Sequence, residues 1–472
     1  MADRYIRTAA AKKSRVVVAD FSGGADFFSD ESVSSPTRAK DCYNFEFSDG
    51  ALKTGYGLSE YSRFGEIALA AVFLYKRYDP DSEGRDDRLV AVSESGELFF
   101  CRADGTDQPA SLDVIFTSAP SFINYRLYGD DVLLITSKSD GMYVWDGVNA
   151  PYRVENAPNI TSMALHYERL FVTVDGEKNA VWFSDDLDPT NWDASLAGGG
   201  FIQLIDERGA LNRVLSYGGY VYVFRDYGIS RITAFGAQTE FSVSNLFVSS
   251  GRIYPGSVAL CGDTVLFLAE DGLYAFDGVS TVKMLKNLDG LFKNGERSCA
   301  YYADGKYYLA FVREETDGKI GCETGSYVNN AMLVLDLSSG SYSLSRGLDI
   351  CNFCRPDDGG VIAITGSGRA GRVEKCGALF GVPLKKKWRV PKTDLGELRK
   401  KRVREIWLNT VYPISVTLRS DTETKTVDFT GGADVQCKRV AFAGRRIGFD
   451  IETSHSFAEL SRPSLVVTKS GG

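Results

Sequence analysis

A repeated eight-residue segment constrains the fold of this chain more than any other feature. Residues 141–148 read GMYVWDGV and residues 272–279 read GLYAFDGV, and each copy follows a Gly/Asp turn and an apolar run. Glycines that open comparable strands stand at Gly96, Gly141, Gly228 and Gly272, in steps of 45, 87 and 44 residues. The long middle step predicts one more, divergent unit near Asn179. A period of about 44 residues is typical of propeller blades, which must stack on neighbours because one blade cannot bury both its faces.

Each unit is expected to be a four-stranded antiparallel meander. Apolar strands follow Gly or Asp turns in a recurring order, and these residues supply the positive φ angles that tight hairpins need. Units fall at about 66–117, 120–156, 159–205, 210–246, 254–289, 297–346 and 349–379. We therefore expect Gly141 and Gly272 at equivalent turns three blades apart. The sixth unit carries an insertion at 313–330 that reads as an exposed loop. The seventh is short, so a strand pair at 42–47 is expected to complete it, and the count is six or seven.

Length and composition agree with an all-β fold, a β-propeller of six or seven four-stranded blades with a C-terminal β-sandwich-like domain. The chain has 472 residues, and its 48 glycines, 28 Phe and 24 Tyr suit many short strands. It contains no run of about 18 apolar residues, and the first residues lack a hydrophobic region. We therefore expect neither a membrane span nor a secretory signal, and synthesis in a cytoplasm.

Charge and periodicity divide the chain into three predicted parts. Residues 1–40 are polar and read as an N-terminal arm, residues 41–383 as the propeller, and residues 384–472 as a C-terminal β-domain with alternating strands. From residue 380 to the end the chain carries 18 Lys and Arg against 10 Asp and Glu, a net charge of +8, whereas the remainder carries −16. The last part therefore differs from the propeller in both pattern and charge.

Sequence signals for catalysis or metal binding are sparse. Neither His166 nor His455 has the neighbours of a catalytic triad or a zinc site. Residues 79–84 alternate carboxylates before a glycine as calcium loops do, but Val90 stands where the bidentate Glu belongs, which favours a solvated loop. The nine cysteines, including the CNFC segment at 351–354, show no pairing pattern and are read as small core residues in a reduced compartment. We expect no enzyme activity, no metal and no cofactor.

Two basic stretches, 385–389 and 399–404, are the strongest charge feature. Clustered cations beside an aromatic residue suit contact with phosphates, because counterion release drives such binding. The other interpretation is a solvated domain junction, or one that docks on an acidic subunit. A net charge of −8 argues against general nucleic-acid binding. The candidate residues for contact with a partner or DNA are Lys385, Lys386, Lys387, Arg389, Arg399, Lys400, Lys401 and Arg402.

Three segments resemble tailed-bacteriophage structural proteins. They are NFEFSDGALKTGYG at 44–57, WFSDDLDPTNW at 182–192 and SSGRIYPGSV at 249–258, the last leading into DGLYAFDG. Together they resemble the propeller proteins of phage head-to-tail connectors and short-tail nozzles, including the packaged-DNA stabilisation type. The likeness spans most of the chain, and its motifs are structural.

This resemblance implies a virion component in the neck or tail, made in the host cytoplasm. Several copies, for example six, would form a homo-oligomeric ring around a channel that holds or passes genome DNA during ejection. The implied partners are portal, adaptor or tail subunits and the DNA itself. A rigid propeller with an acidic lumen suits such a role, because DNA would slide without sticking.

Two other classes stay open, both at a tail tip. A glycan-hydrolysing propeller would need two carboxylates at a blade mouth, but residues 139–141 have the wrong spacing for the sialidase Asp-box. A receptor-binding module would use exposed Tyr and Trp side chains.

Overall fold

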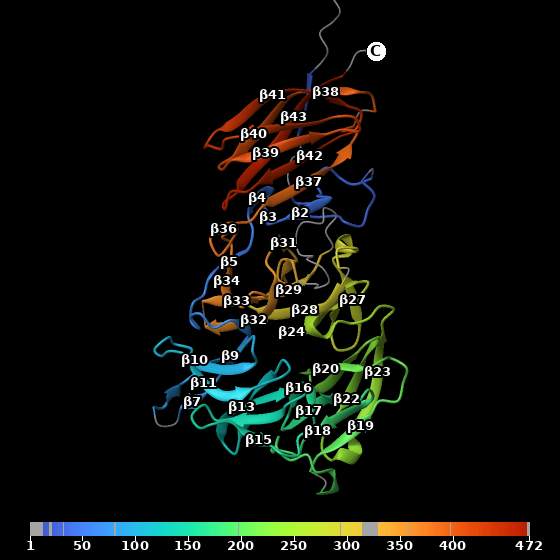
Figure 1. Ribbon diagram of the computed structural model, residues 1–472. Helices are drawn as coiled ribbons and strands as arrows, with labels where there is room; N and C mark the ends of the chain where they lie inside the picture. The colour runs from blue at the N-terminus through green and yellow to red at the C-terminus, as the bar shows by residue number, and fades with distance from the viewer. Residues whose placement is uncertain are drawn as a thin grey trace, which may run out of the picture.

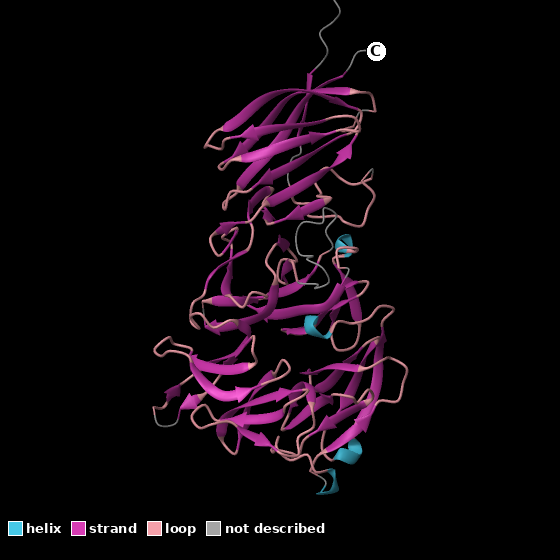
Figure 2. Ribbon diagram, viewed as in Figure 1, coloured by secondary structure: helices cyan, strands magenta, loops and turns pink. Residues whose placement is uncertain are grey.

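The computed structural model describes residues 13–17, 21–31, 33–79, 82–196, 198–292, 294–313, 329–357, 359–396 and 398–469. The protein is all-β, and its helices within these ranges are short 3-10 turns, η1 (Ala194–Leu196), η2 (Gln238–Glu240), η3 (Pro255–Ser257) and η4 (Lys286–Leu288) (Figure 2). In the described part of the chain, no helix has the length and apolar character needed to cross a membrane.

Seven sheets, antiparallel except for one strand pair in the last, follow one another along the described chain between residues 57 and 383 (Figure 1). Sheets 1 to 3 are β6 (Leu69–Tyr75), β9 (Arg88–Ser93), β10 (Glu97–Arg102) and β11 (Ala110–Ile115); β12 (Ser121–Leu127), β13 (Asp130–Ser137), β14 (Gly141–Trp145) and β15 (Tyr152–Val154); and β16 (Ile160–His166), β17 (Arg169–Val174), β18 (Ala180–Phe183) and β19 (Gly200–Gln203). Sheets 4 to 6 are β20 (Leu211–Tyr217), β21 (Tyr220–Arg225), β22 (Gly228–Thr233) and β23 (Ser242–Val248); β24 (Ala259–Cys261), β25 (Thr264–Ala269), β26 (Gly272–Phe276) and β27 (Thr281–Met284); and β28 (Asn294–Ala303), β29 (Lys306–Val312), β30 (Ala331–Asp336) and β31 (Tyr342–Arg346).

Sheet 7 joins two distant parts of the chain. Its strands β32 (Ile350–Asp357), β33 (Gly360–Thr365) and β34 (Ala370–Glu374) pair in order, and β34 then pairs antiparallel with β5 (Gly57–Glu60). The short strands β35 (Ala378–Leu379) and β36 (Val382–Pro383) extend this sheet. A further hairpin, β7 (Tyr78–Asp79) and β8 (Gly84–Arg85), lies between β6 and β9 of sheet 1. The arrangement is propeller-like.

The repeat that the sequence predicts is confirmed in register. Gly141 and Gly272 open β14 and β26, the third strands of sheets 2 and 5, which are three sheets apart. The divergent unit expected near Asn179 is sheet 3, whose third strand begins at Ala180. At Gly96, before the third strand of sheet 1, φ is +85° and a Cβ atom would lie 1.9 Å from the Phe116 carbonyl oxygen. Only glycine fits this turn, so the repeat follows from a local backbone requirement.

Neighbouring sheets share buried apolar clusters. Trp145 of sheet 2 lies with its ring centroid 5.0 Å from Phe100 of sheet 1, and Phe224 of sheet 4 packs 5.5 Å from Phe267 of sheet 5. Further clusters join sheets 2 and 3, 3 and 4, 5 and 6, and 6 and 7. A last one joins sheet 7 to sheet 1, with Ile362 as one of its members. Burial between the sheets is therefore spread over every step of the order.

The remaining strands form two sheets that enclose a common core, here called the two-sheet unit, at the other end of the molecule (Figure 1). The β37 sheet has the order β2 (Asp41–Tyr43), β37 (Lys386–Thr393), β42 (Ile447–Thr453), β39 (Ile414–Arg419) and β40 (Thr424–Phe429). The β38 sheet has the order β3 (Phe45–Ser48), β4 (Ala51–Thr54), β43 (Glu459–Lys469), β38 (Lys401–Thr410) and β41 (Val435–Gly444), and β1 (Lys13–Val17) pairs with β43. The unit contacts sheet 6 through β31.

The N-terminal strands are placed differently from the expectation. Residues 42–47 were expected to complete the seventh blade, but they pair within the two-sheet unit, and β5 completes sheet 7 instead. Likewise, β1 lies in a sheet, although residues 1–40 were predicted to be an arm. Strands from residues 13–54 therefore belong to the two-sheet unit, which the sequence analysis had limited to residues 384–472. Asn44, at φ 61°, marks the turn between the two sheets, and its side chain donates hydrogen bonds to the carbonyls of Arg346 and Lys385. Most of the insertion expected at 313–330 lies outside the described residues, which exclude 314–328.

Candidate functional site

The outward cations of the first basic stretch are paired within the protein. This stretch lies on β37, whose alternate residues point to opposite faces. Three of its cations each meet a carboxylate: Lys385 and Glu452 at 3.1 Å, Lys387 and Asp41 at 3.2 Å, and Arg389 and Asp450 at 3.2 Å. Arg313 also pairs with Asp41, and the cations around that carboxylate outweigh its burial and lower its pKa. These charges therefore hold strands together.

Lys386 points into the protein and is fully buried. Its ammonium donates hydrogen bonds to the carbonyl oxygens of Gly377 at 3.2 Å, Leu384 at 3.2 Å and His455 at 2.8 Å. Burial disfavours the charged form and lowers the pKa of Lys386 to about 8. Because Gly377 borders sheet 7 and His455 follows β42, this side chain joins the two-sheet unit to sheet 7, and it does not face a partner.

The second basic stretch divides in the same way at the start of β38. Lys401 is buried and donates hydrogen bonds from Nζ to the carbonyl oxygens of Arg399 and Arg445. The side chains of Arg399, Lys400 and Arg402 are exposed. Of the eight residues selected from the sequence, these three are the exposed cations of the second stretch.

Strand pairing adds cations from other parts of the chain to this surface. Arg15 on β1 lies opposite Val466 of β43, which lies opposite Glu405 of β38, which in turn lies opposite Arg439 of β41. The Arg15 guanidinium lies 5.9 Å from the centroid of the Trp407 ring, a cation–π geometry. A shallow cavity of about 470 Å³ lies on this sheet, lined by Arg404, Glu405, Arg439, Val440 and Ala441. We call Arg15, Arg399, Lys400, Arg402, Arg404 and Arg439 the cationic end.

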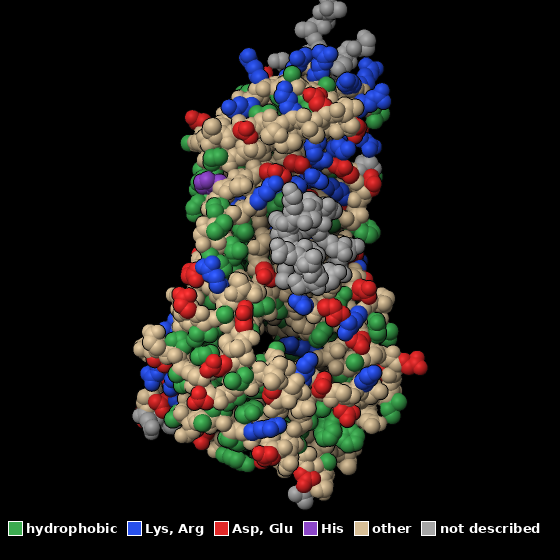
Figure 3. Space-filling model, viewed as in Figure 1, with side chains coloured by type: hydrophobic (Ala, Val, Ile, Leu, Met, Phe, Trp, Pro, Cys, Tyr) green, Lys and Arg blue, Asp and Glu red, His purple; other side chains and the backbone are tan. Residues whose placement is uncertain are grey.

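Figure 3 shows Lys and Arg side chains gathered at the free end of the two-sheet unit, away from the seven sheets. Arg404 could have been selected from the sequence, because it belongs to the basic stretch 399–404. Arg15 and Arg439 were not, because they lie far from that stretch in sequence and join it only through pairing with β43 and β38. A cationic surface is therefore assembled from three separate segments.

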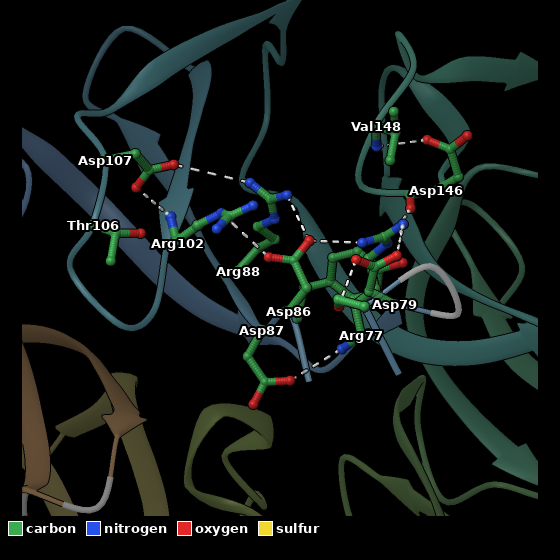
Figure 4. A network of polar contacts seen from close by, with 12 residues as sticks. Arg77, Asp79, Asp86, Asp87, Arg88, Arg102, Thr106, Asp107, Asp146 and Val148 are labelled. Atoms are coloured by element: carbon green, nitrogen blue, oxygen red, sulfur yellow. Dashed lines mark hydrogen bonds and ion pairs between the residues drawn. The ribbon is translucent and has the colours of Figure 1, made fainter. Parts of the chain in front are cut away.

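A second polar centre lies on sheet 1 and was not predicted (Figure 4). The Asp86 carboxylate accepts hydrogen bonds from Arg77 and Arg88, both at 2.6 Å, and Arg102 Nε lies 3.4 Å from its other oxygen. Arg77 also donates from Nε to the carbonyl of Asp146 in sheet 2, at 3.0 Å. The same arginines meet two further carboxylates, because Arg77 lies 4.0 Å from Asp79 and Arg88 lies 3.9 Å from Asp107, so the positive and negative charges of the network balance. The sequence signal for this centre was the high density of Arg and Asp at residues 77–88. The calcium-loop hypothesis considered only residues 79–84 of this segment.

Two adjoining cavities of about 450 and 400 Å³ lie beside this network, and both are lined by Lys76, Arg85 and Asp87. We call them together the recess. Leu74 of β6, Tyr125 of β12, Leu165 of β16 and Arg355 of β32 also line it, so the first strands of sheets 1, 2, 3 and 7 meet there. Within the described residues, no group of three His, Cys, Asp or Glu side chains is arranged to hold a metal ion. Pro80 and Asp81 of the loop considered for calcium lie outside those residues.

The histidines have local structural partners. His166 is buried, burial lowers its pKa, and its Nδ1 lies 2.9 Å from the Ser216 hydroxyl of sheet 4. His455 stacks on Tyr412 with ring centroids 5.0 Å apart. Cys354 is a core residue as expected, whereas Cys351 is exposed, because it stands on the opposite face of β32.

The fold and these sites define a class, an all-β protein of successive four-stranded antiparallel sheets with a cationic two-sheet unit. Comparison with known protein families finds no matching family, and no curated protein matches the chain. Among solved structures, the chain is similar to the computationally designed Ika8 protein, with a TM-score of 0.39 and 11% sequence identity over 67% of this chain and 98% of that chain.

Proposed function

We propose that the seven sheets close into a seven-bladed propeller and that the two-sheet unit is a β-sandwich. In support, each sheet shares a buried cluster with the next, and sheet 7 packs back on β6 of sheet 1. Pairing of β34 with β5 joins the end of the repeat to its beginning, a device that would remove free strand edges. Leu58 in β5 is fully buried, so this joining strand contributes to the core.

We propose that this protein is a non-enzymatic structural subunit of a tailed-phage virion, in a homo-oligomeric ring at the head-to-tail connection or tail nozzle. The observation that carries the proposal is the joining of the two ends of the chain into one stiff body with a cationic surface at its tip. Such a body suits repeated heterologous contacts around an axis, where each copy must keep its shape. The resemblance of residues 44–57, 182–192 and 249–258 to phage proteins supports the same assignment.

In this proposal the cationic end contacts genome DNA in the channel or an acidic face of a neighbouring portal, adaptor or tail subunit. Arg402, Arg404 and Arg439 carry exposed guanidinium groups, which can bind phosphate or carboxylate oxygens through two parallel hydrogen bonds. Lys385, Lys387 and Arg389 contribute less, because Glu452, Asp41 and Asp450 already neutralise them. Binding through this surface should weaken as salt concentration rises.

Cryo-electron microscopy of the particle that carries the protein tests the assignment. A ring of copies on the channel axis, with the cationic end toward DNA or a neighbouring subunit, is the expected result. Single copies or trimers at fibre tips would refute it. In parallel, the Arg402→Glu/Arg404→Glu variant should lower particle yield, whereas Lys178→Glu, at an exposed turn in sheet 3, should not.

The second candidate is a receptor-binding or glycan-hydrolysing propeller of the tail tip. The observation that favours it is the exposure of aromatic side chains on turns: Tyr128 is 81% exposed and Tyr167 is 60% exposed. Tyrosine is enriched among the residues that contribute most of the binding energy at interfaces. A polysaccharide-depolymerisation assay separates hydrolysis from binding alone.

A further inference from the structure

The recess offers charges that the protein does not fully use. The side chain of Lys76 lines both of its cavities and is exposed, and its ammonium has no hydrogen bond or ion pair with any residue that the structure describes. Arg85 pairs with Asp87 at 2.6 Å, yet it remains 67% exposed and keeps donors for another acceptor. The side chain of Arg126, on the wall formed by β12, is exposed as well. A single carboxylate entering the recess would therefore meet several cations.

The same walls carry hydrogen-bonding and aromatic groups suited to hydroxyls. Asn124 Oδ1 accepts a hydrogen bond from the Lys76 backbone amide at 3.2 Å. This contact fixes the Asn124 side chain beside the cations. Asp131 accepts from the Tyr78 backbone amide at 2.8 Å and retains capacity for hydroxyl donors. The ring of Tyr78 is half exposed and lines the cavity, so it offers an apolar face.

The turns that follow β12 and β16 carry exposed aromatic groups in unusual backbone conformations. Tyr128 follows β12 at φ 53°, and Tyr167 follows β16 at φ 50°. Hairpin turns usually place Asn, Asp or Gly at such positions, since a Cβ is disfavoured there. The Tyr128 hydroxyl donates to the Asp188 carboxylate at 3.2 Å, which holds the exposed ring in place. Tyr128 stands two residues after Arg126 of the recess wall and is 81% exposed, so its ring is available to a ligand that extends beyond the recess. The Tyr167 ring instead packs against His166 and Phe235.

We propose that the recess binds a carboxylate-bearing saccharide, of the uronic or sialic acid kind. Lys76 and Arg85 hold the carboxylate, Asp131 and Asn124 bind hydroxyl groups, and Tyr78 packs on the sugar ring. Tyr128 provides a place for a further sugar residue. The four carboxylates that line the recess, Asp86, Asp87, Asp104 and Asp131, favour this ligand over nucleic acid, since they repel a polyanion but accept hydrogen bonds from sugar hydroxyls. The inference is independent of the ring assembly proposed above.

The test is a titration of the full-length protein with each probe, monitored by calorimetry and by saturation-transfer NMR. The probes are N-acetylneuraminic acid and glucuronic acid, with chitotriose as the neutral sugar and inorganic phosphate as the free anion. We expect the protein to bind at least one acidic sugar, and to bind chitotriose and phosphate at least tenfold more weakly. Equal binding of phosphate, or no binding of either acidic sugar at millimolar concentration, would overturn the proposal.

Variants locate the binding on the recess. Lys76→Gln should weaken binding of the acidic sugar at least tenfold, and Tyr78→Ala should weaken it several-fold. Lys178→Gln, the matched loss of an exposed lysine in sheet 3, should bind as the parent protein does. Because the side chain of Lys76 is exposed and has no partner among the described residues, its replacement should leave the thermal unfolding midpoint unchanged, and this is measured alongside. Unchanged affinity in folded Lys76→Gln would refute the assignment.

Discussion

The buried ammonium of Lys386 gives a pH dependence that can be measured. In the folded protein burial lowers its pKa from 10.5 to about 8. Because the folded-state pKa lies below the unfolded one, the unfolded chain binds more protons between these values. The free energy of unfolding should therefore rise as pH increases from about 8 to 10.5. The difference between the two pKa values corresponds to about 3 kcal/mol, with each pH unit contributing about 1.4 kcal/mol.

The perturbation is Lys386→Met, which removes the titrating group and keeps a side chain of similar length. Unfolding by guanidinium chloride, followed by tryptophan fluorescence, is measured for both proteins at pH 7, 8, 9, 10 and 11. The free energy of unfolding of the parent relative to the variant should increase by about 3 kcal/mol across this series. Tyrosine and cysteine titrations are common to both proteins, so the comparison removes them.

A difference that stays constant from pH 7 to 11 would refute the reasoning, because it would mean that Lys386 titrates alike in the folded and unfolded chains. Lys400→Met controls for the loss of one positive charge, since Lys400 is exposed on the same unit. At neutral pH the variant also leaves three carbonyl groups without their shared donor. This second effect is the same at every pH, so it moves the baseline and leaves the slope intact.

Three further changes test the packing. Trp388→Ala should lower the free energy of unfolding by about 3–5 kcal/mol, because the ring is fully buried; a loss below about 1 kcal/mol in denaturant titration would contradict this. Gly96→Ala should cost more than about 1 kcal/mol, since its Cβ would overlap the Phe116 carbonyl, and an unchanged thermal midpoint would argue against that turn. Tyr128→Asn should raise stability by about 1 kcal/mol, because Asn adopts positive φ more readily, and calorimetry showing a loss would mean that the exposed ring stabilises the fold.

The features that the sequence predicted correctly are local ones. Gly141 and Gly272 stand at equivalent strand starts because a tight turn in each sheet demands positive φ, and this requirement is visible in the sequence itself. The unit near Asn179 was found from spacing alone, although Ala180 and not a glycine opens its third strand. Antiparallel meanders are built from neighbouring residues, so their period survives when side chains diverge.

Strand pairing between distant segments could not be predicted from local sequence patterns. Residues 42–47 have the alternation of a strand, but nothing in them specifies β37 and β4 as partners rather than β34. The choice depends on Asn44, whose amide side chain bonds to carbonyls on β31 and just before β37, about 300 residues away. The recess was missed for a similar reason, because its walls come from four sheets that meet only after the sheets pack.

The division of the cations has a direct consequence for any test of partner binding. From the sequence, replacing Lys385, Lys386 and Lys387 by Glu was the natural variant to test assembly. In the structure, Lys386→Glu would bury a carboxylate against three carbonyl oxygens, and Lys387→Glu would face Asp41 and Glu452. Buried, unpaired charges are strongly destabilising, so loss of particles would report unfolding and not a missing contact.

Charge reversal at Arg402 and Arg404 avoids this ambiguity, because both side chains are exposed and neither forms an ion pair among the interactions described. If the cationic end binds an anionic partner, this variant should keep the unfolding midpoint of the parent while losing assembly. If assembly survives the reversal of both charges, the partner must bind elsewhere on the protein. In either case the ion pairs of Lys387 and Arg389 still hold β37 against β2 and β42, because the reversal leaves them unchanged.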